Sequence, residues 1–298
     1  MCRIFTTDGA AVDVSKTNIS VQRTRRENEL PEDIVQQMGP SKHGYQITTY
    51  GNTMLLPGGG VMVVGVDRGP IVLLGSPMID GKDVFQAVKD YVEPAAAMTR
   101  GGAMCRGGGF EPERLAVVRS GDFNVSIAEF PDDLLRLSDK MGGAMAQGVV
   151  DALLRDELKT TIKQSFVVFQ LAADAEKKAN NSLAFIHRLT PAGRLSIPLK
   201  HNGHDKPGEQ FTTPERVVHD ATLHVYDTQI EASQRYVAGI HERPYAFFFG
   251  DHTDLDFRAR FAEAFRRPQD KNSLVYPPSH FYMYKCQGPA ANVDLYTA

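Results

Sequence analysis

Short hydrophobic runs, separated by turn residues, dominate the region between Gly44 and Met78. The runs are rich in β-branched and aromatic residues and cover residues 45–50, 53–56, 61–66 and 71–74. Gly51-Asn52, a Pro-Gly-Gly-Gly tract and an Asp-Arg-Gly-Pro tract stand between them. Runs of this length with such punctuation are typical of antiparallel strands joined by turns. The pattern therefore predicts an extended β-hairpin region over residues 43–79.

A different period begins at Pro131, where hydrophobic residues recur every three or four positions for more than 25 residues. The stripe consists of Leu134, Leu137, Met141, Met145, Val149, Leu153, Leu154, Leu158 and Ile162. This spacing places the side chains on one helical face, and a proline followed by two aspartates suits a helix start. We expect one long helix over residues 131–166. Gly142, Gly143 and Gly148 mark either a close approach of another backbone or a break in that helix.

The rest of the chain divides on either side of these two signals. Residues 1–42 are polar and charged with few periodic hydrophobic positions, which predicts an N-terminal arm. Residues 80–166 hold a short helix over 82–92, strands over 115–119 and 124–129, and the long helix. Residues 167–298 alternate strands and helices. The predicted fold class is α+β, a mixed α/β chain with four regions, namely 1–42, 43–79, 80–166 and 167–298.

Composition narrows the possible functions. The chain has 298 residues, a net charge of −3 and 42% hydrophobic residues, which is ordinary for a globular protein and gives no basic surface for nucleic acid. Three widely spaced cysteines indicate a reducing compartment. No leader and no 20-residue apolar run is visible, so we expect neither secretion nor a membrane span.

Histidines and aspartates gather between residues 201 and 256. The sharpest groups are His201, His204 and Asp205 in one stretch and Asp251 and His252 in another. Imidazoles and carboxylates are ligands for divalent metals that activate water for hydrolysis. Such a stretch is also common on an ordinary solvated surface, and the sequence favours that interpretation, so no cofactor is the first expectation and a divalent metal the alternative.

Asp251 and His252 follow an apolar run over residues 245–249, and Tyr226-Asp227 lies one helix earlier. This arrangement resembles the C-terminal metal half of the alkaline phosphatase and sulfatase superfamily. The resemblance implies a metal-dependent hydrolase of phosphate or sulfate esters. Thr253 stands where that family has a small glycine, and no strand with a metal-binding Asp and a nucleophile is evident nearer the N-terminus.

Cys2 is a second candidate for chemistry, since Met1-Cys2-Arg3 looks like the opening of amide hydrolases with an N-terminal cysteine nucleophile. Those families follow the cysteine with glycine-rich or Arg-Asp signatures that this chain lacks. No phosphate-binding loop, nucleophile elbow or His-Glu-x-x-His motif occurs. The motifs thus favour a non-enzymatic role.

The order of arm, extended β-hairpin, long helix and mixed α/β region resembles the major capsid proteins of the tailed-phage and herpesvirus type. The resemblance implies a structural protein that self-assembles into a large shell. Its partners would be copies of itself in a large homo-oligomer and other virion proteins, with no membrane and no specific nucleic acid. Its location would be the cytoplasm of the host cell and then the virion.

Overall fold

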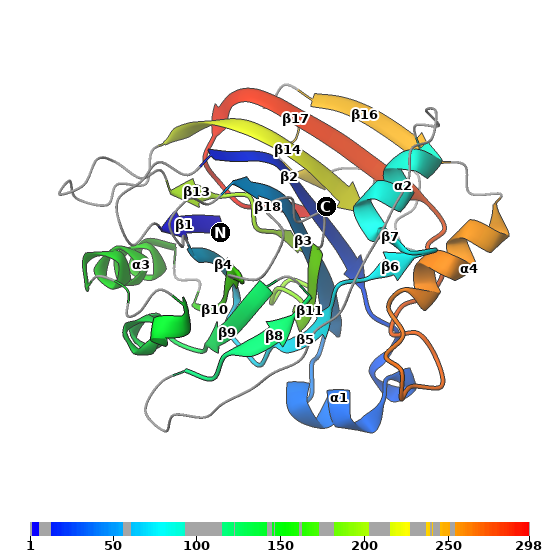
Figure 1. The fold of residues 1–298 in the computed structure, drawn as a ribbon, viewed down its shortest axis with the longest axis horizontal. Helices are drawn as coiled ribbons and strands as arrows, with labels where there is room; N and C mark the ends of the chain where they lie inside the picture. Colours follow the sequence, from blue (N-terminus) through cyan, green and yellow to red (C-terminus); the bar gives the residue numbers. More distant parts are fainter. Residues whose placement is uncertain are drawn as a thin grey trace.

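The protein is an α+β fold in which two large sheets are covered by helices, as the sequence predicts (Figure 1). The computed structural model describes residues 2–5, 13–55, 61–92, 115–121, 123–141, 145, 147–160, 163–172, 182–202, 215–226, 237–238, 240, 245–250 and 254–297. Across the molecule the order of layers is helix, sheet, sheet and helix, from α3 on the left of Figure 1 to α2 and α4 on the right.

The larger sheet has seven strands and curves through the middle of the molecule. In spatial order its strands are β16 (Tyr245–Gly250), β17 (Phe281–Ala291), β14 (Arg216–Val225), β2 (Asp13–Arg23), β3 (Tyr45–Leu55), β11 (Ser182–Arg188) and β5 (Val72–Gly75). All of its pairs are antiparallel except β14 with β2, which is parallel.

The second sheet has six strands and packs on one face of the first. Its order is β13 (His201–Asn202), β1 (Cys2–Phe5), β4 (Val61–Asp67), β10 (Gln164–Leu171), β9 (Phe123–Ala128) and β8 (Val118–Ser120). The two sheets enclose a core in which alternating side chains of both meet, among them Val21, Met62, Phe169 and Leu223. Alternation puts the other half of each strand on the opposite face.

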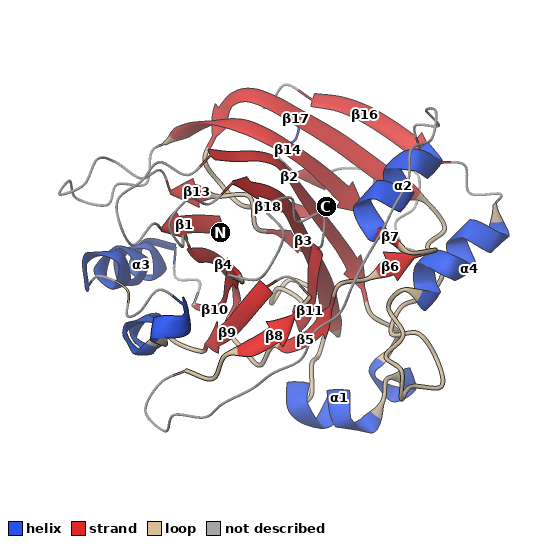
Figure 2. Cartoon of the chain, viewed as in Figure 1, coloured by secondary structure: helices blue, strands red, loops and turns tan. Residues whose placement is uncertain are grey.

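Smaller elements complete the described fold, and Figure 2 separates helices from strands. Three short strands form one small sheet and two form a hairpin: β12 (Ser196–Ile197), β18 (Leu295–Thr297) and β15 (Val237–Ala238), then β6 (Met78–Ile79) with β7 (Lys82–Asp83). The α-helices are α1 (Glu32–Met38), α2 (Val84–Val92), α3 (Gln147–Thr160) and α4 (Leu255–Glu263), and 3₁₀ helices cover Glu27–Glu29, Pro131–Arg136 and Asp139–Met141. Helices α1, α2 and α4 share a core with the outer face of the seven-stranded sheet.

The predicted N-terminal arm is wrong for the part of residues 1–42 that the structure describes. Residues 13–23 form β2, which lies between β14 and β3 in the middle of the seven-stranded sheet. Ile19 and Val21 are buried in the core between the sheets, whereas Ser20 and Gln22 are buried on the opposite face. Because both faces of β2 are covered, buried polar residues alternate with buried apolar ones along it, and the sequence has the composition of an exposed segment.

The predicted extended hairpin over residues 43–79 is also wrong. Strand β3 pairs with β2 and β11 in one sheet, whereas β4 pairs with β1 and β10 in the other. Gly51-Asn52 is not a turn, because β3 continues through it. Gly51 lies directly beneath Phe85 of α2, where a glycine in a strand permits close approach. The described strands of both large sheets come from several of the four predicted regions.

The single long helix predicted over 131–166 is absent from the described residues. The chain forms two 3₁₀ helices, then α3 from Gln147, and β10 begins at Gln164. The first 3₁₀ helix ends where Leu137 takes an extended ψ of 136°, and the Met145 amide donates back to the Leu134 carbonyl at 3.1 Å. The hydrophobic stripe is nevertheless real, since Leu134, Met141, Met145 and Leu153 share a core with the outer face of the six-stranded sheet.

The contact over Gly51 gives the first prediction. A methyl group at Gly51 would approach the Phe85 ring to 2.7 Å, so Gly51→Ala should lower the free energy of unfolding by about 1–3 kcal/mol. Gly148 in α3 has open space where a methyl group would stand, with nothing within 4 Å, so Gly148→Ala should instead raise it by about 1 kcal/mol. Urea denaturation of both variants measures these changes. Equal effects of the two substitutions would contradict the close packing of α2 on β3.

Candidate functional site

The predicted metal ligands fall mostly where the structure gives no description. His204, Asp205, Asp251 and His252 lie outside the described residues, so their convergence stays a prediction. His201 begins β13, where its backbone pairs with that of Cys2 in β1. Among the residues that are described, no three His, Cys, Asp or Glu side chains gather closely enough to hold a metal ion.

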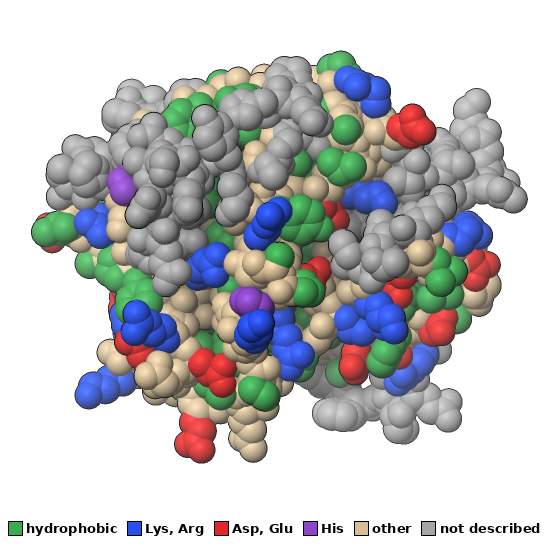
Figure 3. Space-filling view, turned by 180° about the vertical axis from the view of Figure 1, so that it is seen from behind, with side chains coloured by type: hydrophobic (Ala, Val, Ile, Leu, Met, Phe, Trp, Pro, Cys, Tyr) green, Lys and Arg blue, Asp and Glu red, His purple; other side chains and the backbone are tan. Residues whose placement is uncertain are grey.

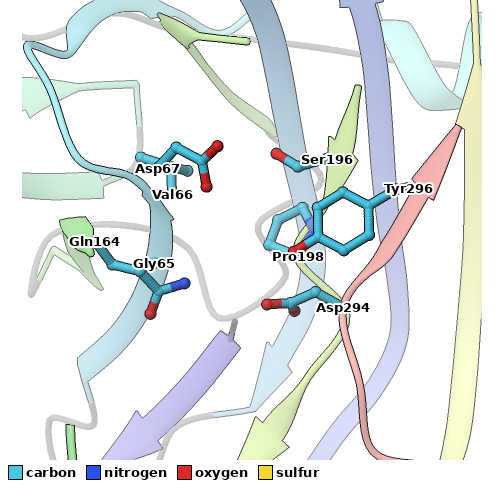
Figure 4. Close-up of a pocket in the computed structure, with 8 residues that line it drawn as sticks. All are labelled: Gly65, Val66, Asp67, Gln164, Ser196, Pro198, Asp294 and Tyr296. Carbon is cyan, nitrogen blue, oxygen red and sulfur yellow. The ribbon is translucent and has the colours of Figure 1, made fainter. Parts of the chain in front are cut away.

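An acidic pocket lies where β4 approaches the small sheet of β12 and β18. It is a small pocket lined by Gly65, Val66, Asp67, Gln164, Ser196, Pro198, Asp294 and Tyr296. Figure 4 shows the Asp67 and Asp294 carboxylates pointing into the same space. The Lys200 amide donates to Asp294 at 2.8 Å, whereas Oδ2 of Asp67 is buried and receives no hydrogen bond from the part of the chain that the structure describes.

The surroundings of Asp67 in this pocket are unfavourable for a charged carboxylate. Burial raises the pKa of Asp67, and the nearby Asp294 raises it further. Burial, followed by the charges of Asp294 and Asp67, raises the pKa of Tyr296 to about 12. The arrangement can therefore retain a proton on Asp67 above its usual pH range, and the Tyr296 hydroxyl stays protonated as a hydrogen-bond donor.

A second unusual feature is a row of polar side chains buried on the outer face of the seven-stranded sheet. His224 of β14, Ser20 of β2 and Thr49 of β3 are directly adjacent in the strand registers. All three are buried, His224 with 1% of its surface exposed. Among the described residues, neither ring nitrogen of His224 and neither hydroxyl of the other two has a hydrogen-bond partner. We refer to His224, Ser20 and Thr49 as the polar row.

Helix α2 covers this row with apolar side chains. The Phe85 ring lies 5.0 Å from the His224 ring, and Val84 and Val88 belong to the same buried core. Nearby, the Gln22 Nε2 atom and the Tyr226 hydroxyl are also buried without partners. Each such group costs about 1–3 kcal/mol when it loses water and gains no hydrogen bond. Burial lowers the pKa of His224 to about 3, so the ring is neutral near pH 7.

His187 shows how the same fold accommodates a satisfied histidine. It is buried between the sheets, with Nε2 2.8 Å from the Thr48 hydroxyl and Nδ1 2.9 Å from the Arg188 carbonyl. Burial lowers its pKa to about 4. Because both nitrogens are paired, His187 has a structural role that the unpaired ring of His224 does not share.

A third feature is the edge of the seven-stranded sheet at β16. Tyr245 and Phe247 are 37% and 40% exposed there. Their rings lie against Tyr284, 5.9 and 5.2 Å away between centroids. In the register of β16 with β17, Phe247 stands opposite Tyr284, so both rings lie on the same face of the sheet. An apolar edge strand that has a described neighbour on one side alone is a surface on which another strand can pair.

The remaining surface offers fewer indications of a partner. Figure 3 shows Lys or Arg and Asp or Glu side chains next to one another over the described part of the rear face. Mixed charge of this kind fits the net charge of −3 and forms no uniformly basic surface there.

The described helices also bear on whether the chain could cross a membrane. None of the helices that the structure describes combines the length and apolar character needed to cross a bilayer.

Sequence analysis missed both the acidic pocket and the polar row. Asp67 stands in what the sequence presents as a turn, and Asp294 is 227 positions away in an unremarkable segment. Ser20 and His224 occupy polar positions of alternating strands, which normally point to solvent. Only the register, which sets these residues side by side under α2, identifies them.

Comparisons with known proteins yield distant structural likenesses. No family model and no curated protein matches the sequence. The crystal structure of baculovirus P35 aligns over 99% of this chain and 92% of its own, with 11% identity and a TM-score of 0.39. A mutated baculovirus P35 after caspase cleavage aligns over 95% and 99%, with 9% identity and a TM-score of 0.42. The caspase-8/P35 complex gives 10% identity and a TM-score of 0.34 over 95% and 90%. Likenesses at this level carry no function over to this chain.

The acidic pocket gives the second prediction. Because the neutral form of Asp67 is favoured in the folded state, Asp67→Asn should raise the free energy of unfolding at pH 7 by about 1 kcal/mol. The gain should vanish below pH 3.8, where the carboxyl is protonated in both the folded and the unfolded chain. Urea denaturation at pH 7 and pH 3 measures both values. Asp132→Asn, at an exposed position, is the matched control, and a loss of stability in Asp67→Asn at pH 7 would contradict the assignment.

Proposed function

We propose that the protein is a structural, self-associating protein whose copies meet through the edge of the seven-stranded sheet at β16. The observation that carries this proposal is the uncharged edge strand Tyr245–Gly250, which pairs on one side alone within the described residues. Sheet edges that must remain unpaired are usually protected by charged residues, proline or a bulge. Tyr-Ala-Phe-Phe-Phe-Gly contains no charge and no proline, and its register with β17 is regular.

The opposite edge of the same sheet is not available in this way. Strand β5 ends at Gly75, and a methyl group on Gly75 would lie 3.8 Å from the Ser120 hydroxyl of β8. One on Gly121 would approach the Ser76 hydroxyl to 2.6 Å. The end of β5 therefore lies close to β8 of the six-stranded sheet. Within the described residues, β16 has no strand on its outer side.

The occupant that fits this edge best is a second copy of the chain. An antiparallel pair of β16 strands related by a two-fold axis is self-complementary, and neither strand brings a charge that would repel the other. Pairing would also cover Phe247 of each copy. A two-fold contact alone gives a dimer. The more specific proposal is a closed shell of the viral capsid type with other virion proteins as partners. Such a shell would require further contacts between copies.

The experiment introduces a charge at the centre of the edge. Phe247→Lys should convert a dimer or larger assembly into a monomer of about 33 kDa, because a lysine in each strand would repel its counterpart. Light scattering coupled to size-exclusion chromatography gives the mass. Far-ultraviolet circular dichroism of the same samples tests whether the fold is retained.

Leu158→Lys is the matched control, because Leu158 is an apolar side chain of α3 that is 81% exposed and far from β16 in the fold (Figure 1). This variant should keep the mass of the unmodified protein. The proposal would be contradicted if the unmodified protein were a monomer at a concentration of about 100 µM. It would also be contradicted if the assembly persisted in Phe247→Lys with its fold intact.

A further inference from the structure

Helix α2 is held by specific contacts at both ends, whereas the surface beneath it consists partly of polar side chains that have no hydrogen-bond partner among the described residues. At its start the Asp83 carboxylate accepts from the Ser182 amide and hydroxyl at 2.9 and 2.7 Å, and from the Phe85 amide at 2.9 Å. At its end Tyr91 stacks on Phe257 of α4, with ring centroids 4.1 Å apart. Between these anchors, the helix lies over the unpaired atoms of the polar row.

The segment before α2 has the geometry of a pivot. The hairpin of β6 and β7 turns at Asp80 and Gly81, with φ of 51° and 76°. The Asp80 carboxylate is held by Arg260 of α4 at 2.6 Å. The turn is therefore fixed to α4, while β7 continues directly into α2.

We propose that α2 is a lid that opens about the β6–β7 turn and gives water access to Ser20, Thr49 and His224. The closed lid buries Phe85 and its apolar neighbours, which favours closure. It also leaves the side chains of the polar row without a hydrogen bond from any described residue, which opposes closure. Because these contributions oppose one another across one surface, opening the lid requires much less free energy than unfolding the sheets.

Acid should favour the open lid through His224. The groups around its ring are Ser20 from β2, Phe85 from α2, Tyr226 from its own strand, and Met283 and Lys285 from β17. Burial and Lys285 both oppose a charged ring in the closed state, whereas water would solvate it in the open state. Asp83 acts in the opposite sense, because burial raises its pKa and acid then favours its closed, protonated form.

The sign for His224 follows from its lowered pKa. The open state binds a proton below the ordinary value of 6.5, and the closed state binds one only near 3. Through His224 alone, opening therefore becomes more favourable as the pH falls from about 7 to about 5, by roughly 25-fold in the equilibrium constant.

The experiment compares two thiols in one molecule. Ser20→Cys places a thiol on the face beneath the lid, whereas the native Cys286 is buried in the core between the two sheets. Maleimide labelling followed by peptide mass spectrometry should modify the introduced thiol at least about tenfold faster than Cys286 at pH 7. The labelling rate of the introduced thiol, corrected for the thiolate fraction at each pH, should rise roughly 25-fold from pH 7 to pH 5. Adding His224→Gln, which does not titrate, should abolish this rise.

Hydrogen exchange of the unmodified protein provides the second measurement. The amides of α2 should exchange faster than those of β2 relative to their intrinsic rates, and the protection of α2 should fall between pH 7 and pH 5. Equal labelling of the two thiols, or α2 amides protected to the same degree as β2, would overturn the proposal. A pH effect that persists in His224→Gln would overturn the role of His224.

Discussion

The seven-stranded sheet has to be covered on both faces, and most of the structure follows from how this is achieved. The six-stranded sheet covers one face with alternating aliphatic and aromatic side chains, and α1, α2 and α4 cover the other. The two coverings differ in quality. Between the sheets His187 finds partners for both nitrogens, whereas beneath α2 His224 finds none. The face toward the second sheet therefore pairs its buried histidine fully, whereas the face beneath α2 leaves its buried histidine without a hydrogen bond from any described residue.

Local elements could be predicted from the sequence where their pattern is complete within a few residues. Helix α2 lies within two residues of its predicted position, and strand β16 covers the apolar run over residues 245–249, because apolar spacing and flanking turn residues suffice to define them. The fold class is likewise confirmed. Strand β2 has the sequence of an arm because polar residues on a doubly covered strand look exposed. The stripe after Pro131 is buried, as its spacing indicates, but it is not continuous, since helical spacing does not reveal where a chain doubles back.

The candidate sites could not be predicted, since each is a product of pairing between distant segments. Asp67 meets Asp294 because β4 approaches the small sheet at the C-terminus, and Ser20 meets His224 because β2 and β14 run parallel in one register. The edge at β16 is a partial exception. Its apolar sequence is recognisable as a strand, but its position at the end of the sheet depends on the order of all seven strands. The near-neutral net charge could be read directly from the composition, and the mixture of acidic and basic side chains in Figure 3 agrees with it.

The parallel pair of β2 with β14 also sets the order in which the chain can fold. Residues 17–21 pair with residues 221–225, about 200 positions later, and the sheet cannot close around β2 until both are available. Contacts over such separations incur a large loop-closure entropy and form late. During synthesis β2 must therefore leave the ribosome long before its partner exists, with β3 as its only available neighbour in the sheet. A folding intermediate built on β2 and β3 would expose Ile19 and Val21, so this chain depends on rapid completion of the sheet, or on a chaperone, to avoid premature association.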